Sequence, residues 1–333
     1  MYPNANSKAY RRLDRFQRVV WRLVARSPLE TLWKLQGISG RELAVRTWKS
    51  IMADRVFGHA AELGFYFLFS LFPTLFCAGS IIGLAAQSGN QIYTRILNYL
   101  AFVIPTTALG TVLDTFNQTT VAASSSKVTL SSIAAIWSAS VGISAIQDSL
   151  NEVYKIKDSR SYIVARIYAI DLTILLTLIL SLSLGAMFGG DLVAKLAYLH
   201  ISDPFASVAA AISARIIGWT IATALLILSF AVIYYWAPDW KKRRWRWFTP
   251  GAALGIIGWL LASLALRIYL HYFNTYAITY GSLGAVIILL TWFYISGLML
   301  LFGAELNSGI EAAGVELRLA ASMASTTDPE TAQ

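Results

Sequence analysis

The chain has 333 residues, of which 56% are hydrophobic and only 14% are charged, whereas roughly 25% are charged in an average soluble domain. This composition excludes a soluble globular protein, because too few polar side chains are present to cover its surface. The formal net charge is +9, and with Cys77 as the single cysteine no disulfide can form within the chain.

The first 55 residues form a basic segment that contains twelve Lys and Arg residues. No apolar stretch followed by a cleavage site is present, so the segment is not a secretion signal. Between Lys8 and Arg26 apolar residues recur at helical spacing and basic residues fill much of the remainder, which predicts an amphipathic helix on an anionic membrane surface. The predicted lipid contacts are Arg11, Arg12, Arg15, Arg18 and Arg22. The alternatives are a solvated helix face and nucleic-acid binding, and we expect no nucleic-acid partner.

Two capping boxes, Ser27–Glu30 and Ser39–Glu42, predict that short helices begin before the first long apolar run.

Six apolar runs are long enough to cross about 30 Å of hydrocarbon as helices. Two of them begin with a capping residue followed by proline, at Asp203-Pro204 and at Thr249-Pro250, as is typical of helix N-termini. Pro73 predicts a kink inside the first run. The predicted spans are Gly58–Ala86, Val128–Asp148, Tyr162–Gly190, Ser207–Trp236, Pro250–Phe273 and Gly281–Leu306.

The loops on the two sides of these spans differ sharply in Lys and Arg content. One side receives twenty-two of the 27 basic residues, and the other receives Arg95, Lys127 and Lys195. Because cytoplasmic loops are rich in Lys and Arg, both termini are predicted to be cytoplasmic. The sequence therefore predicts an all-α polytopic membrane protein, with a basic cytoplasmic segment (1–55), a six-helix transmembrane domain (56–310) and a disordered cytoplasmic tail (311–333).

Small residues recur at every fourth position in three predicted spans, as close helix packing in lipid requires. The three stripes are Thr173, Thr177, Ser181, Gly185 and Gly189; Ala210, Ala214, Gly218 and Ala222; and Ser131, Ala135, Ser138, Gly142 and Ala145.

Four segments resemble the YihY/BrkB family of bacterial inner-membrane proteins, whose members were once labelled ribonuclease BN. They are YGSLGAVIILLTWFYISGLMLLFGAELN (Tyr280–Asn307), AELGFYFLFSLFPTLF (Ala61–Phe76), IWSASVGISAIQDSLNEVY (Ile136–Tyr154) and WFTPGAALGIIGWLLASLALRIYL (Trp247–Leu270). Glu62 departs from the similar pattern, which has a small apolar residue there. The resemblance implies six spans in the inner membrane, and it leaves the biochemical activity open.

The sequence contains no recognisable catalytic motif. Its three histidines, His59, His200 and His271, lack the spacing of metal ligands, and CxxC, P-loop, G-x-G-x-x-G and G-x-S-x-G patterns are absent. We therefore predict that the protein is not an enzyme and has neither a cofactor nor a metal site.

Six ionisable residues fall inside the predicted spans, where charge is costly and is a candidate for function. Four acids lie toward the cytoplasmic ends, and two arginines, which can each bind a phosphate through two parallel hydrogen bonds, lie toward the outer ends. The residues are Glu62, Asp148, Asp171 and Glu305, with Arg215 and Arg267. Arg215, Arg267, Asp171 and Glu62 are the predicted substrate contacts. The alternative for each is a structural ion pair or a position close to water.

Three classes of function fit these features. The favoured one is a transporter or flippase for an anionic or amphipathic, lipid-like solute. A non-transporting scaffold for envelope assembly is the alternative, and a membrane-embedded enzyme is the least favoured. Anionic membrane lipids are the predicted partners in every case.

Overall fold

The computed structural model describes residues 39–84, 125–156, 158–239, 249–272 and 283–327. This part of the chain forms seven helices and contains no strand. The helices are α3 (Gly40–Ala53), α4 (Val56–Leu84), α7 (Ser125–Val153), α8 (Tyr162–His200), α9 (Pro204–Trp236), α10 (Pro250–Tyr272) and α12 (Leu283–Thr327). The predicted basic helix between Lys8 and Arg26, with its five arginines, and the capping box at Ser27 lie outside the described residues.

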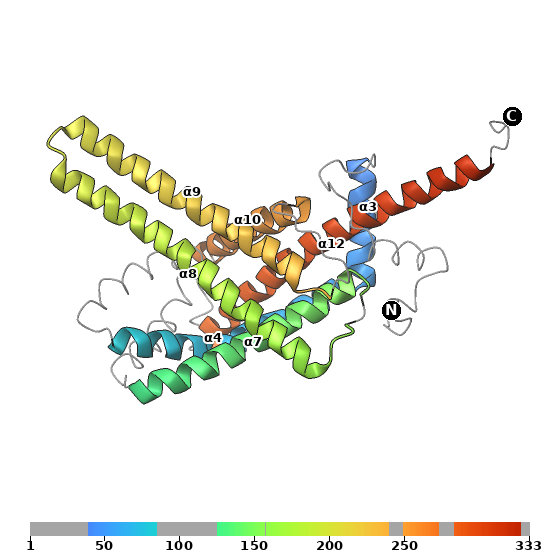
Figure 1. The fold of residues 1–333 in the computed structure, drawn as a ribbon, viewed down its shortest axis with the longest axis horizontal. Helices are drawn as coiled ribbons and strands as arrows, with labels where there is room; N and C mark the ends of the chain where they lie inside the picture. Colours follow the sequence, from blue (N-terminus) through green and yellow to red (C-terminus); the bar gives the residue numbers. More distant parts are fainter. Residues whose placement is uncertain (1–38, 85–124, 157, 240–248, 273–282, 328–333) are drawn as a thin grey trace.

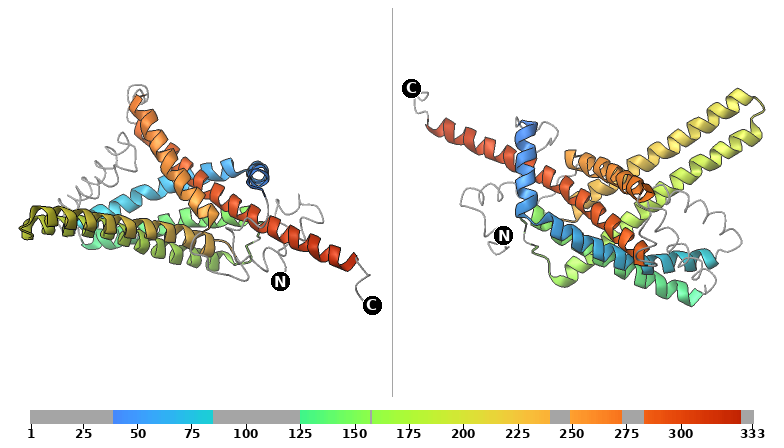
Figure 2. Two further views of the ribbon diagram at one scale, coloured as in Figure 1. Left: turned by 90° about the horizontal axis from the view of Figure 1, so that it is seen from above. Right: turned by 180° about the vertical axis from the view of Figure 1, so that it is seen from behind.

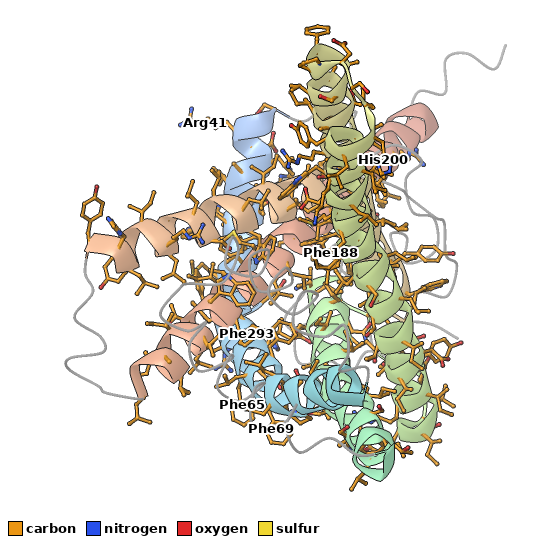
Figure 3. All side chains as sticks on the ribbon, turned by 90° about the vertical axis from the view of Figure 1, so that its left-hand side faces the viewer. Arg41, Phe65, Phe69, Phe188, His200 and Phe293 are labelled. Carbon is orange, nitrogen blue, oxygen red and sulfur yellow. The ribbon has the colours of Figure 1, made fainter. Side chains whose placement is uncertain are left out.

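Six of these helices are long and apolar enough to cross a membrane, which confirms the predicted all-α polytopic fold. The exception is α3, a 14-residue helix that runs across the C-terminal half of α12 (Figure 1). Many large apolar side chains on the six long helices are exposed, as side chains that face lipid must be. Phe65 and Phe69 on α4 are examples: they are 59% and 58% exposed, and their rings stack with centroids 6.4 Å apart (Figure 3).

Three helices begin at the residues that the sequence predicts. The hydroxyl of Ser39 accepts a hydrogen bond of 3.2 Å from the backbone N–H of Glu42. Asp203 accepts one of 2.9 Å from Ala206, and the hydroxyl of Thr249 accepts one of 3.1 Å from the backbone N–H of Ala252. Because each cap binds an N–H group that has no partner within its own helix, these contacts fix where α3, α9 and α10 begin.

The long helices pack as pairs. An antiparallel hairpin is formed by α8 and α9, α4 packs along α7, and α12 packs against both α10 and α4. Figure 2 shows that these pairs converge on the middle of α12 and that the α8–α9 hairpin and α10 point away from each other beyond it. We call the end where α4 begins and α7 ends the inner end, since the Lys and Arg distribution predicts it to be cytoplasmic, and the opposite end the outer end.

The main hydrophobic core lies toward the inner end, where α4, α7 and α12 come together. The members that these three helices bury almost completely include Val56, Ala60, Leu63, Leu150, Val153, Leu301 and Ala304. Burying these side chains fixes the mutual positions of the three helices, and the polar groups described below are embedded in the same region.

Close approach of helices depends on small residues, as predicted, but one of the three stripes is wrong. The stripes on α7 and α9 are confirmed, since Ser131, Ala145, Gly218 and Ala222 are buried. On α8 the buried small residues include Gly190, Ala194 and Ala197, whereas Gly185 and Gly189 have no neighbouring atom that an added Cβ would touch. Small residues occur on more than one face of α8, and only packing against α9 selects the face that is used.

Several helices extend beyond their predicted limits, and α8 and α12 do so the furthest. The third predicted span ends at Gly190, but α8 continues to His200. The sixth predicted span ends at Leu306, but α12 continues to Thr327, so residues 311–327 of the predicted tail are helical. The part of α12 that follows Leu306 is held by α3, because Leu43 of α3 packs with Ile310 and Arg46 donates a hydrogen bond of 2.6 Å to Glu316.

Candidate functional site

Several charged side chains at the inner end are almost completely buried, and three of them form one group. Asp54 and Lys155 form an ion pair in which their side chains are 5% and 7% exposed. Glu305 of α12 is 1% exposed, and the charged groups that act on it are Asp54 and Lys155. We call Asp54, Lys155 and Glu305 the inner cluster.

Asp54 is positioned by the sharp turn between α3 and α4. It caps the C-terminus of α3, and its backbone N–H donates to the carbonyl of Ser50 at 2.8 Å. The next residue, Arg55, has a φ of 55°, a left-handed conformation that costs roughly 1–2 kcal/mol for a residue with a side chain. This turn changes the direction of the chain sharply within two residues and leaves the Asp54 carboxylate beside α7 and α12.

Lys155 is positioned by the C-terminus of α7, where it occupies a place that usually belongs to glycine. Its own N–H donates to the carbonyl of Glu152 at 3.0 Å, and the N–H of Ile156 donates to the carbonyl of Asn151 at 2.7 Å. These two bonds form the Schellman motif, whose left-handed residue is normally glycine. Lys155 adopts this left-handed conformation with a φ of 54°. The chain thus carries an unfavourable backbone conformation at the position from which the ammonium group reaches Asp54.

Two carboxylate oxygens of the inner cluster are buried without a hydrogen-bond donor among the described residues. They are Oε1 of Glu305 and Oδ2 of Asp54, although Oδ2 faces the Lys155 ammonium. The surrounding side chains include Ile51, Leu150 and Leu301, which are apolar. Because ionised groups in such surroundings each cost several kcal/mol unless they are fully paired, this arrangement is a candidate for function rather than a source of stability.

Neutral polar residues tie α12 to the helices beside the inner cluster. The side chain of Asn307 accepts a hydrogen bond of 2.8 Å from the N–H of Gly251 and donates one of 2.9 Å to the hydroxyl of Thr249. The hydroxyl of Ser308 donates to the carbonyl of Val153 at 3.2 Å. The inner half of α12 is therefore attached to the start of α10 and to α7 by polar side chains that follow Glu305 within one helical turn.

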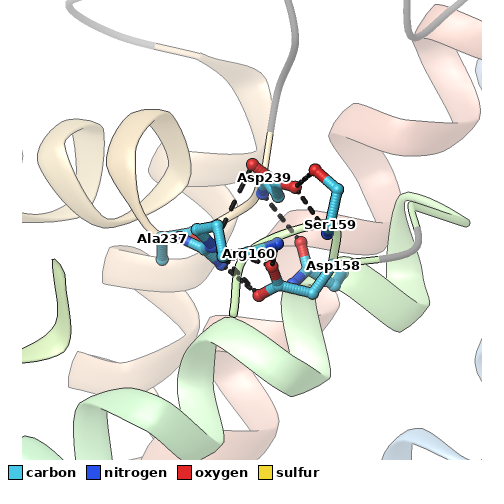
Figure 4. A network of polar contacts seen from close by, with 6 residues as sticks. Asp158, Ser159, Arg160, Ala237 and Asp239 are labelled. Atoms are coloured by element: carbon cyan, nitrogen blue, oxygen red, sulfur yellow. Dashed lines mark hydrogen bonds and ion pairs between the residues drawn. The ribbon is translucent and has the colours of Figure 1, made fainter. Parts of the chain in front are cut away.

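A second polar network joins the loop after α7 to the end of α9 (Figure 4). The guanidinium of Arg160 donates to Asp158 at 2.8 Å, and Ser159 donates to Asp239 through its N–H at 2.8 Å and its hydroxyl at 2.6 Å. Asn151 of α7 accepts from the N–H of Asp239 at 2.8 Å. Burial alone would raise the pKa of Asp158, but its hydrogen bonds with Arg160 outweigh this and the pKa is lowered. This network fixes the loops that flank the inner cluster.

At the outer end, Arg215 of α9 pairs with Asp191 of α8, with Nε and Oδ1 3.3 Å apart and side chains that are 53% and 39% exposed. A shallow, open groove of about 550 Å³ begins at this arginine and follows one face of α9 inward, and all of its lining residues belong to α9 itself. It is lined by Arg215, Ile216, Trp219, Thr220, Thr223, Ala224 and Ile227. The two threonine hydroxyls donate to carbonyls of α9 itself, so the groove is apolar apart from its charged outer end.

The other predicted substrate contacts lie apart from this groove. Arg267 is on the outer half of α10, and Figure 2 shows that α10 and the α8–α9 hairpin point in different directions there. Glu62 is exposed on α4, 3.6 Å from His59, and Asp171 is exposed on α8. Their roles in substrate binding stay predictions. Within the described residues, no group of three His, Cys, Asp or Glu side chains could hold a metal ion.

Asp54 is absent from the candidates that the sequence predicts, and Lys155 counts there only as a loop charge. A signal for Asp54 exists, because a capping box at Ser39 begins a helix that must end before the first span. Nothing in the sequence signals that Lys155 turns inward, since a lysine directly after a span is the usual pattern of a cytoplasmic loop.

The model of the family described as Virulence factor BrkB matches residues 47–326. The putative ribonuclease-like protein YfkH of Bacillus subtilis is 34% identical over 251 residues, which cover 75% of this chain and 88% of YfkH. A UPF0761 membrane protein of Idiomarina loihiensis is 26% identical over 51% of the chain and 56% of that protein. One of Xanthomonas oryzae is 24% identical over 80% of the chain and 60% of that protein. No solved structure matches the chain.

Proposed function

The chain belongs to the BrkB family and is a multi-pass protein of the bacterial inner membrane, and from this premise we propose that it moves an anionic or amphipathic, lipid-like solute along the groove on α9. The observation that carries the proposal is the groove itself, which joins a charged outer end to a long apolar wall within a membrane span. An amphipathic molecule has the same division between a charged head and an apolar tail.

The dimensions of the groove fit a lipid within one leaflet. Its lining extends from Arg215 to Ile227, which is about 18 Å along a helix at 1.5 Å per residue, and half of the hydrocarbon core is about 15 Å thick. A head group bound at Arg215 would therefore leave its acyl chain beside Thr223 and Ala224. Trp219 would lie between them, at the depth where aromatic side chains favour the boundary between polar and apolar regions.

The charged end supports binding of a phosphate. A guanidinium can donate two parallel hydrogen bonds to phosphate oxygens, and Arg215 is 53% exposed, so a ligand can reach it. Asp191 already neutralises this arginine, and an incoming phosphate would replace it or leave it to bind an ammonium group of the same head group. Contact of one phosphate with both Arg215 and Arg267 would require α9 and α10 to approach each other at the outer end.

The second candidate is a scaffold that does not transport. It is favoured by the inner end, where Leu301, Ala304 and Glu305 of α12 are buried against their neighbours. A transporter would have to open this packing during each cycle, whereas a scaffold would keep it closed. The name of YfkH includes the term ribonuclease-like. Our proposal for this chain includes no catalytic step.

The test is lipid movement in vesicles that contain the purified protein and a phospholipid with a fluorescent head group. A reductant that cannot cross the membrane removes the fluorescence of the outer leaflet, and the remaining decay measures transfer between leaflets. We expect the wild type to accelerate transfer and Arg215→Leu to slow it at least about tenfold, which corresponds to about 1.4 kcal/mol. The matched control is Lys195→Leu, which removes an exposed cation of α8 outside the groove and should leave the rate unchanged. Absence of transfer by the folded wild type would favour the scaffold.

A further inference from the structure

The inner cluster brings two carboxyl groups to a single ammonium group. Asp54 comes from the turn between α3 and α4, Lys155 from the end of α7 and Glu305 from the middle of α12. Lys155 pairs with Asp54, so the positive charge is already bound to one carboxylate. Glu305 lies beside this pair and has no cation of its own among the described residues.

Glu305 is buried with Oε1 unpartnered among the described residues, and the charged groups that act on this carboxyl group are Asp54 and Lys155. A carboxylate only accepts hydrogen bonds, and the ammonium group of Lys155 is already paired with Asp54. A proton on Glu305 removes the excess negative charge that two carboxylates and one ammonium group would otherwise leave in a buried site. Two carboxylates beside a single ammonium group in apolar surroundings cannot both stay ionised without a large cost in free energy.

From this geometry we infer that Asp54 and Glu305 form a proton-binding site at the inner end of the membrane domain, with Lys155 as its fixed counter-charge. The proton neutralises the excess negative charge where the α3–α4 turn meets α12. Its release leaves a second buried negative charge beside Asp54, which favours separation of α12 from that turn. The site is independent of the groove on α9, so it does not depend on the proposed transport.

The charged groups on the surrounding helices leave this assignment unchanged. On α4, His59 pairs with the exposed Glu62, and these two act on Asp148 of α7 rather than on the inner cluster. Arg46 of α3 is bound to Glu42 and Glu316. On α10, the charged side chain and the histidine lie in the outer half, at Arg267 and His271, and Glu311, which is also buried, lies six residues beyond Glu305 on α12.

Infrared spectroscopy of the purified full-length protein tests the site, because a protonated carboxyl group has a C=O stretching band that a carboxylate lacks. We expect the wild type at neutral pH to show this band in a form that resists exchange with bulk water. Glu305→Gln should remove it, and Asp54→Asn should weaken it, because the excess negative charge is then gone and Lys155 can pair with Glu305. The matched control Glu62→Gln, at an exposed carboxyl group of α4, should leave the band unchanged.

The variants also separate the proposal from a purely structural role. Glutamine has the shape of a protonated glutamate, so Glu305→Gln should fold and keep its thermal midpoint within a few degrees of the wild type, whereas Glu305→Leu should lower it strongly. The inference is overturned if the wild type has no protonated carboxyl band at neutral pH, or if the band persists in Glu305→Gln. A band that disappears only in Glu311→Gln would show that Glu311 carries the proton, and this would also overturn the inference. Sodium ions that raise the thermal midpoint of the wild type but not of Glu305→Gln would identify a metal-cation site instead, and would also overturn the inference.

Discussion

At the level of single residues, Lys155 combines a costly backbone conformation with a buried charge. Its φ of 54° is one of two positive values among the non-glycine residues of the described chain, and the other belongs to Arg55. Both residues lie where a helix ends, and both belong to the surroundings of one ion pair. Lys155 is one partner of this pair, and Arg55 directly follows the other partner, Asp54. Strained residues of this kind persist only where the surrounding structure holds them, and they are frequent at functional sites.

This arrangement predicts an unusual order of stability at position 155. Lys155→Ala removes the counter-charge of two buried acids and should lower the free energy of unfolding by about 3 kcal/mol. Lys155→Gly loses the same ion pair, but glycine adopts the left-handed conformation without a steric cost. This variant should therefore be about 1 kcal/mol more stable than Lys155→Ala. Thermal unfolding of the purified protein in detergent measures the difference.

The control for this prediction is the neighbouring position 152, which is helical. There glycine should be less stable than alanine by about 1 kcal/mol, the ordinary order inside a helix. The same order at both positions would contradict the left-handed conformation of Lys155.

At the level of helices, the α8–α9 hairpin depends on backbone approach at two glycines. A Cβ on Gly218 would lie 2.7 Å from the carbonyl oxygen of Ala186, and one on Gly190 would lie 2.8 Å from that of Ala214. These obstacles are backbone atoms, which cannot move aside without displacing a whole helix. The hairpin therefore needs glycine at both positions, whereas Gly185 on the same helix has open space around it.

We predict opposite effects for two identical substitutions in this hairpin. Gly218→Ala should separate the helices and lower the thermal midpoint by several degrees, since overpacking typically costs 1–3 kcal/mol. Gly185→Ala should leave the midpoint unchanged or raise it slightly, because alanine favours the helix and meets no neighbour. Thermal unfolding of both variants in the same detergent checks this, and equal destabilisation by the two would show that the hairpin packs in a different register.

At the level of the whole molecule, the hairpin is longer than a membrane is thick. With 39 residues in α8, its length is about 58 Å at 1.5 Å per residue, against about 30 Å of hydrocarbon. Even with the tilt that Figure 1 shows relative to α7, its outer tip at His200 and Pro204 extends past the hydrocarbon. The inner end is also extended, by the part of α12 that packs against α3.

The orientation of the molecule is testable with single cysteines in a Cys77→Ser background. A cysteine at Ser202, at the tip of the hairpin, should react with a thiol reagent that cannot cross the membrane when intact cells are treated. A cysteine at Thr326, near the end of α12, should react only after the cells are broken. The reverse pattern would place the inner end outside the cell and would invert the assignment made from the Lys and Arg distribution.

The sequence alone was sufficient for the features that depend on a single helix. Six apolar runs, the caps at Ser39, Asp203 and Thr249, and the stripes on α7 and α9 could all be predicted, because helix length, capping and one-sided packing are set by residues a few positions apart. The ends of α8 and α12 could not, since the glycines at the ends of their apolar runs, Gly190 and Gly309, resemble stop signals but lie inside the helices.

The candidate sites were decided by tertiary structure. Asp54, Lys155 and Glu305 are separated by 101 and 150 positions in the chain, and only the convergence of α3, α7 and α12 brings two acids to one base. Arg215 could be chosen from the sequence as a charge within a span, but its pairing with Asp191 arises from the register of α8 against α9. Burial and pairing are properties of the packed bundle, and for this reason the chemistry of a charge cannot be read from its place in the chain.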